Sequence, residues 1–303
     1  MTRQKKLLIF ISLAFTVMVT LLALRGGNRP VCERLPCAVT AFGGERSARD
    51  HFGELRAGAV GEAELLPEEL WPGGHYPGPR HEGGVFTLAI GDITQTGEPE
   101  RRLVSPKRFR IRHVYELEGS DLLLHGTFTR TIKAVGAEED LAVSFQTISD
   151  LASEYFRGVD AHFLLRVTRG GRVMWIRGIS PFEPESDGSY ALNVSRTGAV
   201  TVVGMYDGHP RLGVGGSTER LLPRGFAVFA ARFSGDGEVD WCGVIGHGWV
   251  VFHSVAVADE DRVFVLAQGR RDAQFYREGG VWEIPRDWWF TAEFTACAHP
   301  SLE

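Results

Sequence analysis

The feature that most constrains this fold is a two-part pattern that occurs three times between residues 86 and 267. Its first part is an apolar strand, a hydroxyl residue, two more residues and a glycine, and these glycines are Gly97, Gly171 and Gly237. Its second part is an apolar hairpin further along each unit. A long-period repeat of short strands is typical of a β-propeller or another β array.

The expected fold is all-β: a β-propeller of about four four-stranded blades, with an N-terminal apolar export or anchor helix. Residues 85–128, 161–205 and 227–267 are each expected to form one blade. The segment 290–295 matches the first strand of a unit again, but the chain ends before the other strands. We expect it to pair with part of residues 31–60, which completes the last blade and removes exposed sheet edges.

The N-terminus has the pattern of an export signal, because basic residues precede the uncharged apolar run 7–24. The charge order places the rest of the chain outside the cytoplasm. The sequence leaves open whether the signal is cleaved, giving a periplasmic or secreted protein, or stays as an anchor facing the periplasm or exterior. The predicted organisation is a signal peptide or signal anchor at 1–27, a linker at 28–36 and the β-propeller domain at 37–303.

Four cysteines in an exported chain predict disulfide bonds. Cys297 follows the last predicted strand, and Cys32 and Cys37 lie in the segment expected to pair with that strand. A bond from Cys297 to one of them would lock the array shut, whereas a local Cys32–Cys37 bridge and free thiols are the alternatives. Cys242 is the fourth candidate, and the lack of a Cys-x-x-Cys pair argues against a zinc site.

Two phrases carry a resemblance to a known family. They read Phe-Leu-Leu-Arg-Val-Thr-x-Gly-Gly-x-Val-x-Trp175 and Phe-Ala-Ala-Arg-Phe-Ser-x-Asp-Gly-x-Val-x-Trp241, each followed by an apolar hairpin. They resemble bacterial β-propeller-repeat surface proteins of the SBBP type, over residues 85–297. The first repeat departs from the pattern, with Arg101 where tryptophan is expected. The resemblance implies an exported, surface-associated protein and supplies no catalytic residue.

The segment 234–241 also resembles the Asp-box turn of sialidase-type propellers, although its glycine comes one place early. An Asp-box is a structural turn, so we expect this segment to shape the backbone. A calcium loop through Asp236, Glu238 and Asp240 is the alternative. Trp175 and Trp241 are expected to pack between neighbouring sheets, because large aromatic side chains fill such gaps.

Binding residues are expected on the face of the array that carries the long loops, since scaffolded folds bind through loops. Basic and acidic loops side by side predict polar recognition of a protein or a glycan. The alternative is a propeller-type hydrolase or lyase that acts on a polysaccharide through the carboxylates of an acidic loop. The expected binding residues are Lys107, Arg108, Arg110, Glu183, Glu185, Asp187, Asp207, His209, His247 and Trp249.

Charge and motifs restrict the other function classes. The net charge of −5 gives no general affinity for nucleic acid. The sequence has no phosphate loop, dinucleotide fingerprint or Gly-x-Ser-x-Gly motif. We therefore predict no cofactor, no metal site and no catalytic residue, and a membrane contact only through residues 7–24.

Overall fold

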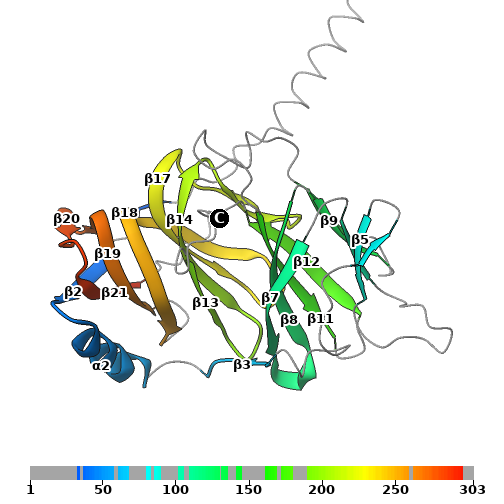
Figure 1. Ribbon diagram of the computed structural model, residues 1–303, viewed down its shortest axis with the longest axis horizontal. Coiled ribbons are helices and arrows are strands. Elements are labelled where there is room, and N and C mark those ends of the chain that lie inside the picture. The colour runs from blue at the N-terminus through cyan, green and yellow to red at the C-terminus, as the bar shows by residue number, and fades with distance from the viewer. Residues whose placement is uncertain are drawn as a thin grey trace, which may run out of the picture. The chain divides into compact units, whose positions relative to one another are not determined.

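The computed structural model describes residues 33–34, 37–57, 61–67, 80–82, 85–89, 102–105, 109–129, 131–135, 141–144, 161–168, 172–179, 190–258 and 262–295. They belong to one compact unit, Cys32–Glu303. These described residues form three β-sheets, an α-helix, α2 (Glu45–Arg56), and a short 3-10 turn, η2 (Glu118–Ser120) (Figure 1).

The sheets are named by their number of strands. The five-stranded sheet has the order β10 (Leu141–Ser144), β9 (Thr131–Val135), β6 (Arg102–Ser105), β5 (Val85–Ala89), β4 (Arg80–Glu82). The seven-stranded sheet has the order β16 (Arg220–Leu221), β15 (Arg211–Val214), β12 (Val173–Ile179), β11 (Ala161–Val167), β8 (Leu122–Phe128), β7 (Phe109–Glu116), β3 (Glu64–Leu65). The nine-stranded sheet has the order β13 (Tyr190–Val194), β14 (Val200–Gly208), β17 (Gly225–Phe233), β18 (Val239–Val257), β19 (Arg262–Arg277), β21 (Trp289–Thr295), β2 (Cys37–Phe42), with β1 (Glu33–Arg34) beside β18 and β20 (Gly280–Glu283) beside β19.

The predicted all-β character is confirmed, but the predicted β-propeller is wrong. The described strands form three open sheets, and none of the three closes on itself. The repeated strands and hairpins are present, and Gly198 and Gly237 have the positive φ expected of their turns. The error lies in how the strands are grouped.

The structural unit is shifted by half a repeat from the predicted blade. Strand β8, from the hairpin of the first repeat, pairs with β11, which begins the second repeat. In the same way β14 pairs with β17, which begins the third repeat. The alternation of apolar residues identifies a strand but not its neighbours, so the sequence pattern fits either grouping.

An additional hairpin, which lies between the first two predicted blades, explains the first of these shifts. Strands β9 and β10 pair with each other, and β9 pairs with β6. Ile132, Ala134 and Val143 are buried on this hairpin. The hairpin therefore completes the sheet of β5 and β6, and β7 and β8 join β11 instead.

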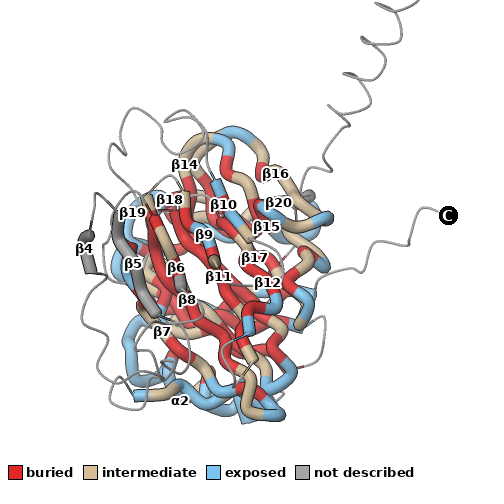
Figure 2. Tube along the Cα trace, turned by 90° about the vertical axis from the view of Figure 1, so that its right-hand side faces the viewer, coloured by how far each residue is buried: buried red, intermediate tan, exposed pale blue. Residues whose placement is uncertain are grey.

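The sheets pack in layers, each through its own apolar core. Leu103 and Ile132 of the five-stranded sheet pack against one face of the seven-stranded sheet, which supplies Phe163. The opposite face supplies Leu164, which packs against Phe229 of the nine-stranded sheet. Consecutive apolar residues are needed on β11 because both faces of this sheet are buried. Figure 2 shows the resulting continuity of buried residues through the central strands.

The nine-stranded sheet bends so that it supplies two layers. The first part of β18 pairs with β17, and its second part pairs with β19. Three register shifts interrupt the β18–β19 pairing between His247 and Ser254. At Gly246 a Cβ atom would lie 2.2 Å from the Gln274 carbonyl oxygen, so only glycine fits this approach. The two parts of the sheet then pack on each other through a third core that includes Val228, Ile245 and Phe290.

Helix α2 covers the outer face of the last layer. Ala48 and Phe52, one turn apart, are buried against Phe264 and Trp289. The rest of the helix is mostly exposed, as its pale colour in Figure 2 shows. Of the segment 31–60, residues 37–42 form a strand as expected, whereas residues 45–56 form this helix, which the sequence pattern did not reveal.

The predicted pairing between the two ends of the chain is present. Strand β21 pairs with β2 in antiparallel register, with Ala292 opposite Val39. This pairing forms the edge of the open nine-stranded sheet and not the last blade of a propeller. It places Cys37 in the core, where burial raises the pKa of its thiol to about 12.

The predicted export segment 7–24 and most of the predicted linker lie outside the described residues. In the parts of the chain that are described, no helix is long and apolar enough to cross a membrane. Export and anchoring therefore stay predictions.

Substitution of Gly246 by alanine tests the bend of the nine-stranded sheet. The added methyl group would overlap the Gln274 carbonyl, so we expect a loss of about 3 kcal/mol in the free energy of unfolding. The control is Gly53→Ala, where no atom lies within 4 Å of the new Cβ and the helix should gain about 0.5–1 kcal/mol. Urea unfolding measures both, and equal stability of the two variants would contradict the role of the bend.

The strand β1 makes a specific prediction for the disulfides. Cys242 is disulfide-bonded, and Glu33 pairs in parallel with Gly243. Because parallel strands keep the same direction, the residue before Glu33 is expected opposite Cys242, so we expect a Cys32–Cys242 bond. Peptide mapping without reduction should recover that pair; a Cys297–Cys242 peptide would contradict it. Cys37 is a buried thiol whose Sγ donates to the Ile245 carbonyl, so the Cys297–Cys37 and Cys32–Cys37 bonds considered from the sequence are wrong. A Cys297–Cys32 bond is an alternative to the Cys32–Cys242 bond, and both Cys297 and Cys32 lie outside the described residues.

Candidate functional site

Half of the predicted binding residues can be located. Lys107, Arg108, Glu183, Glu185 and Asp187 lie outside the described residues. Arg110 is exposed on β7 of the seven-stranded sheet. The remaining four belong to the nine-stranded sheet or lie directly after one of its strands: Asp207, His209, His247 and Trp249.

Trp249 is the centre of an exposed aromatic group. Its side chain is 41% exposed, and its ring lies 5.3 Å from that of Phe226, centroid to centroid, at 41°. Asp207 is the strand partner of Phe226, and Arg271 is the partner of Trp249. Partners directly opposite share a sheet face, so Asp207 lies on the face of Phe226 and Arg271 lies on the face of Trp249. We call Phe226, Trp249 and Arg271 the aromatic platform.

His247 lies beside this platform but has a structural contact. Its Nδ1 is 3.1 Å from the Tyr276 hydroxyl, and the two rings meet edge to face at 4.9 Å. The contact joins β18 to β19 next to the bend of the sheet. Tyr276 is a neighbour that the sequence pattern did not reveal.

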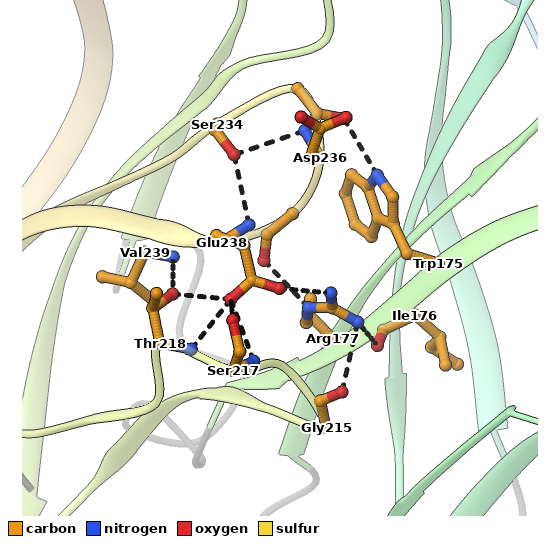
Figure 3. Close-up of polar contacts among 12 residues, drawn as sticks. Trp175, Ile176, Arg177, Gly215, Ser217, Thr218, Ser234, Asp236, Glu238 and Val239 are labelled. Carbon is orange, nitrogen blue, oxygen red and sulfur yellow. Dashed lines mark hydrogen bonds and ion pairs between the residues drawn. The ribbon is translucent and has the colours of Figure 1, made fainter.

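The predicted Asp-box-like turn is held by a compact network of hydrogen bonds, which we call the knot (Figure 3). The Ser234 hydroxyl accepts hydrogen bonds from the backbone amides of Asp236 and Glu238. The Trp175 indole donates to the Gly235 carbonyl at 2.9 Å. Trp175 is buried, which agrees with the packing role expected of it.

Glu238 is the centre of the knot. One carboxylate oxygen accepts hydrogen bonds from the amides and hydroxyls of Ser217 and Thr218, at 2.8–2.9 Å. The other oxygen pairs with Arg177 at 2.7 Å. Partial burial opposes ionisation, but these hydrogen bonds outweigh it and lower the pKa of Glu238 to about 2. With both oxygens engaged, Glu238 is not available to a calcium ion.

A second polar group, which the sequence pattern did not reveal, lies between the seven- and nine-stranded sheets. His113 Nδ1 is 3.2 Å from His125 Nδ1, and His125 Nε2 is 3.0 Å from His162 Nδ1. The successive ring planes are within 11° and 5° of parallel, with centroids 5.4 and 5.3 Å apart. The rings therefore meet edge to edge through their nitrogen atoms and form a hydrogen-bonded chain. We call His113, His125 and His162 the histidine chain.

The histidine chain spans three neighbouring strands, β7, β8 and β11. His125 is 1% exposed and His162 is 5% exposed, while His113 is half-buried. The Tyr190 ring, from β13 of the nine-stranded sheet, meets His162 at 4.9 Å and His125 at 5.4 Å edge to face. The chain is therefore part of the contact between two layers.

A β-bulge adds a positive charge to this site. Ile111 pairs with Gly126 and His113 pairs with His125, so Arg112 is the extra residue of β7. Bulges commonly re-aim side chains in this way. The positive charge of Arg112 lowers the pKa of all three histidines and opposes the rise that burial causes in the pKa of Tyr190.

Burial and charge keep these histidines neutral. Burial is the main cause that lowers the pKa of His113, of His125 and of His162, and Arg112 lowers each further. For His162 the pKa falls to about 3. His125 is also lowered by its two histidine neighbours. Burial penalises the charged form of an imidazole, so these rings are more stable uncharged.

The histidine chain is not arranged to bind a metal ion. Its nitrogens face one another at hydrogen-bond distance and do not converge on a common point. No group of three or more His, Cys, Asp or Glu side chains in the described residues is placed to hold a metal. One signal in the sequence could have revealed the pair His113–His125: the two stand at equal distances from Gly119, where the hairpin turns.

Comparison with known proteins adds no assignment. Neither a protein-family model nor a curated protein matches the chain. The resemblance to SBBP-type surface proteins therefore stays a prediction, and the function rests on the geometry of the platform and the histidine chain.

Substitution of Glu238 by glutamine tests the knot. The amide keeps the size but loses the charge that Arg177, Ser217 and Thr218 stabilise, so we expect a loss of about 2 kcal/mol in unfolding free energy at pH 7. Urea unfolding measures it. The matched control is Glu45→Gln, an exposed helical pair with Arg49, which should change stability by less than about 0.5 kcal/mol. Equal effects would show that the knot does not stabilise the fold.

Proposed function

We propose that this protein is an exported binding module that recognises a glycan through the aromatic platform. The observation that carries the proposal is the exposed Trp249 ring held against Phe226 with Arg271 opposite it. A sugar ring has a C–H face that stacks on an aromatic ring and hydroxyl groups around its rim. The platform offers the flat apolar surface and its neighbours offer the polar contacts.

Packing against Phe226 restricts the Trp249 side chain. Phe226 supports the indole from β17, and β18 and β19 are paired on either side of this position. A side chain that is ordered before binding loses less entropy when a ligand arrives. Trp249 is therefore suited to recognition, whereas Trp175 is used for packing.

The polar neighbours favour a hydroxyl-rich ligand over a hydrophobic one. Arg271 is highly exposed and lies 3.3 Å from Asp272. Asp207 stands beside Phe226 in the strand pairing, and His209 is exposed directly after β14. Carboxylates accept and guanidinium groups donate hydrogen bonds, so both kinds of contact with sugar hydroxyls are supplied.

Catalysis on a polysaccharide remains the alternative, and it depends on Glu183, Glu185 and Asp187, which lie outside the described residues. Export likewise rests on the sequence pattern of residues 7–24. Neither is needed for the binding proposal.

Binding of the full chain to a panel of polysaccharides and to a glycan array tests the proposal, with titration calorimetry on the best ligand. Trp249→Ala should weaken binding by about tenfold or more, since removal of a central aromatic contact typically costs over 1 kcal/mol. Trp288→Ala is the matched control, because it removes another exposed tryptophan, 42% exposed, outside the platform. Retained affinity in Trp249→Ala, or no binding to any glycan, would overturn the proposal.

A further inference from the structure

We propose that the histidine chain is an acid-sensitive joint between the seven- and nine-stranded sheets. The joint is closed while the three histidines are neutral, and it opens when they are protonated. This inference is independent of the glycan proposal. It starts from the geometry of three imidazole rings joined nitrogen to nitrogen at 3.2 and 3.0 Å in a buried site.

Proton counting shows how many added protons the histidine chain can accept before its contacts break. Each of the two N···N contacts holds one proton, because one nitrogen must donate and the other accept. The third proton of three neutral rings then lies on an outer nitrogen, Nε2 of His113 or of His162. One added proton can occupy the other outer nitrogen without breaking a contact. A second added proton places two N–H groups face to face, and a third breaks both contacts.

Electrostatics opposes even the first added proton. Among the described residues, the Arg112 guanidinium of the β7 bulge lowers the pKa of each of the three histidines, and His113 and His162 lower that of His125. Tyr115 on β7 and Tyr190 on β13 are the other titratable side chains that the described part of the chain packs around the site. Burial raises the pKa of both, so they are neutral at physiological pH. The Glu62 carboxylate also raises the pKa of Tyr115. It accepts hydrogen bonds from Arg56 and from the Asn193 side-chain amide.

The position of the chain determines which part of the fold responds. His125 and His162 contact Tyr190 on the edge strand of the nine-stranded sheet. Beside them, the segment 61–66 joins the two sheets: the Ala63 amide donates to Val194, and the Leu66 amide donates to Val114. Protonation of the three histidines therefore acts at the edge where the two layers are joined. The bend within β18 and β19 lies elsewhere in the nine-stranded sheet.

The direction of the pH effect is set by linkage. In the unfolded chain all three histidines bind protons below about pH 6.5, whereas the folded chain holds fewer. Stability is unaffected above that pH, falls as the pH drops below it, and continues to fall until each folded pKa is reached, about 3 for His162. For each proton that the unfolded chain binds and the folded chain does not, the unfolding equilibrium constant rises about tenfold for each pH unit of acidification. With two to three such protons, the increase is roughly a hundredfold to a thousandfold per unit.

Two measurements on the full chain test the joint. Urea unfolding between pH 7.5 and 5 should give a slope of log K against pH that, below about pH 6, is steeper by two to three protons than in the triple variant His113→Gln, His125→Gln, His162→Gln. The control His209→Gln removes an exposed histidine and should change the slope by no more than about one proton. An unchanged slope in the triple variant would overturn the proposal.

The second measurement needs no variant, so it decides the matter even if the triple variant fails to fold. Hydrogen exchange of the wild-type chain, corrected for the intrinsic pH dependence, should rise on acidification first in β7, β8 and β13. Ring signals of the histidine chain in NMR spectra should remain those of neutral imidazole while the protein is folded. Ordinary titration of these rings near pH 6.5, or earlier opening of β19 and β21, would overturn the proposal.

Discussion

The close crossing of β18 and β19 is the constraint on which the rest of the structure depends. At Gly248, which has φ of +92°, a Cβ atom would lie 2.0 Å from the Asp272 carbonyl oxygen, and Gly246 makes a similar approach one residue pair away. Two backbones can come this near only where side chains are absent. The crossing turns the sheet so that one long hairpin serves two successive layers, and the exposed Trp249 and Arg271 pair directly beside it. A flat sheet of the same strands would have no second layer for α2 to cover.

Much of the local structure could be predicted from the sequence. Strands were expected where apolar residues alternate, and Ala38–Phe42 and Phe290–Thr295 were correctly expected to meet across the whole length of the chain. The turn at 234–241 was correctly expected to be structural, and Trp175 was expected to be buried. These features depend on residues near in sequence or on an apolar strand at each end of the chain, and such signals survive without knowledge of the fold.

The arrangement of strands could not be predicted, because it depends on pairing between distant segments. A hairpin such as β13–β14 has the same sequence pattern whether its next partner comes before or after it. Helix α2 was missed because Ala48 and Phe52 provide only a narrow apolar face. The histidine chain was missed for a related reason: His162 reaches His125 only once β8 and β11 are neighbours. Of the aromatic platform only Trp249 was expected, in a segment that was expected to be a loop and is part of β18, whereas Phe226 and Arg271 come from adjacent strands.

The helix at the outer face of the last layer has a consequence for assembly. A stack of sheets has no intrinsic length, because every apolar face that is left open can accept another sheet. Repeat proteins end such growth with capping units whose outer side is polar. Here α2, twelve residues long, covers Ala256, Phe264 and Leu266 with one apolar face and presents Glu45 and Arg49 to solvent. Loss of this cap would leave the apolar face of Ala256, Phe264 and Leu266 open to solvent, and an open apolar face is a surface at which another molecule can associate.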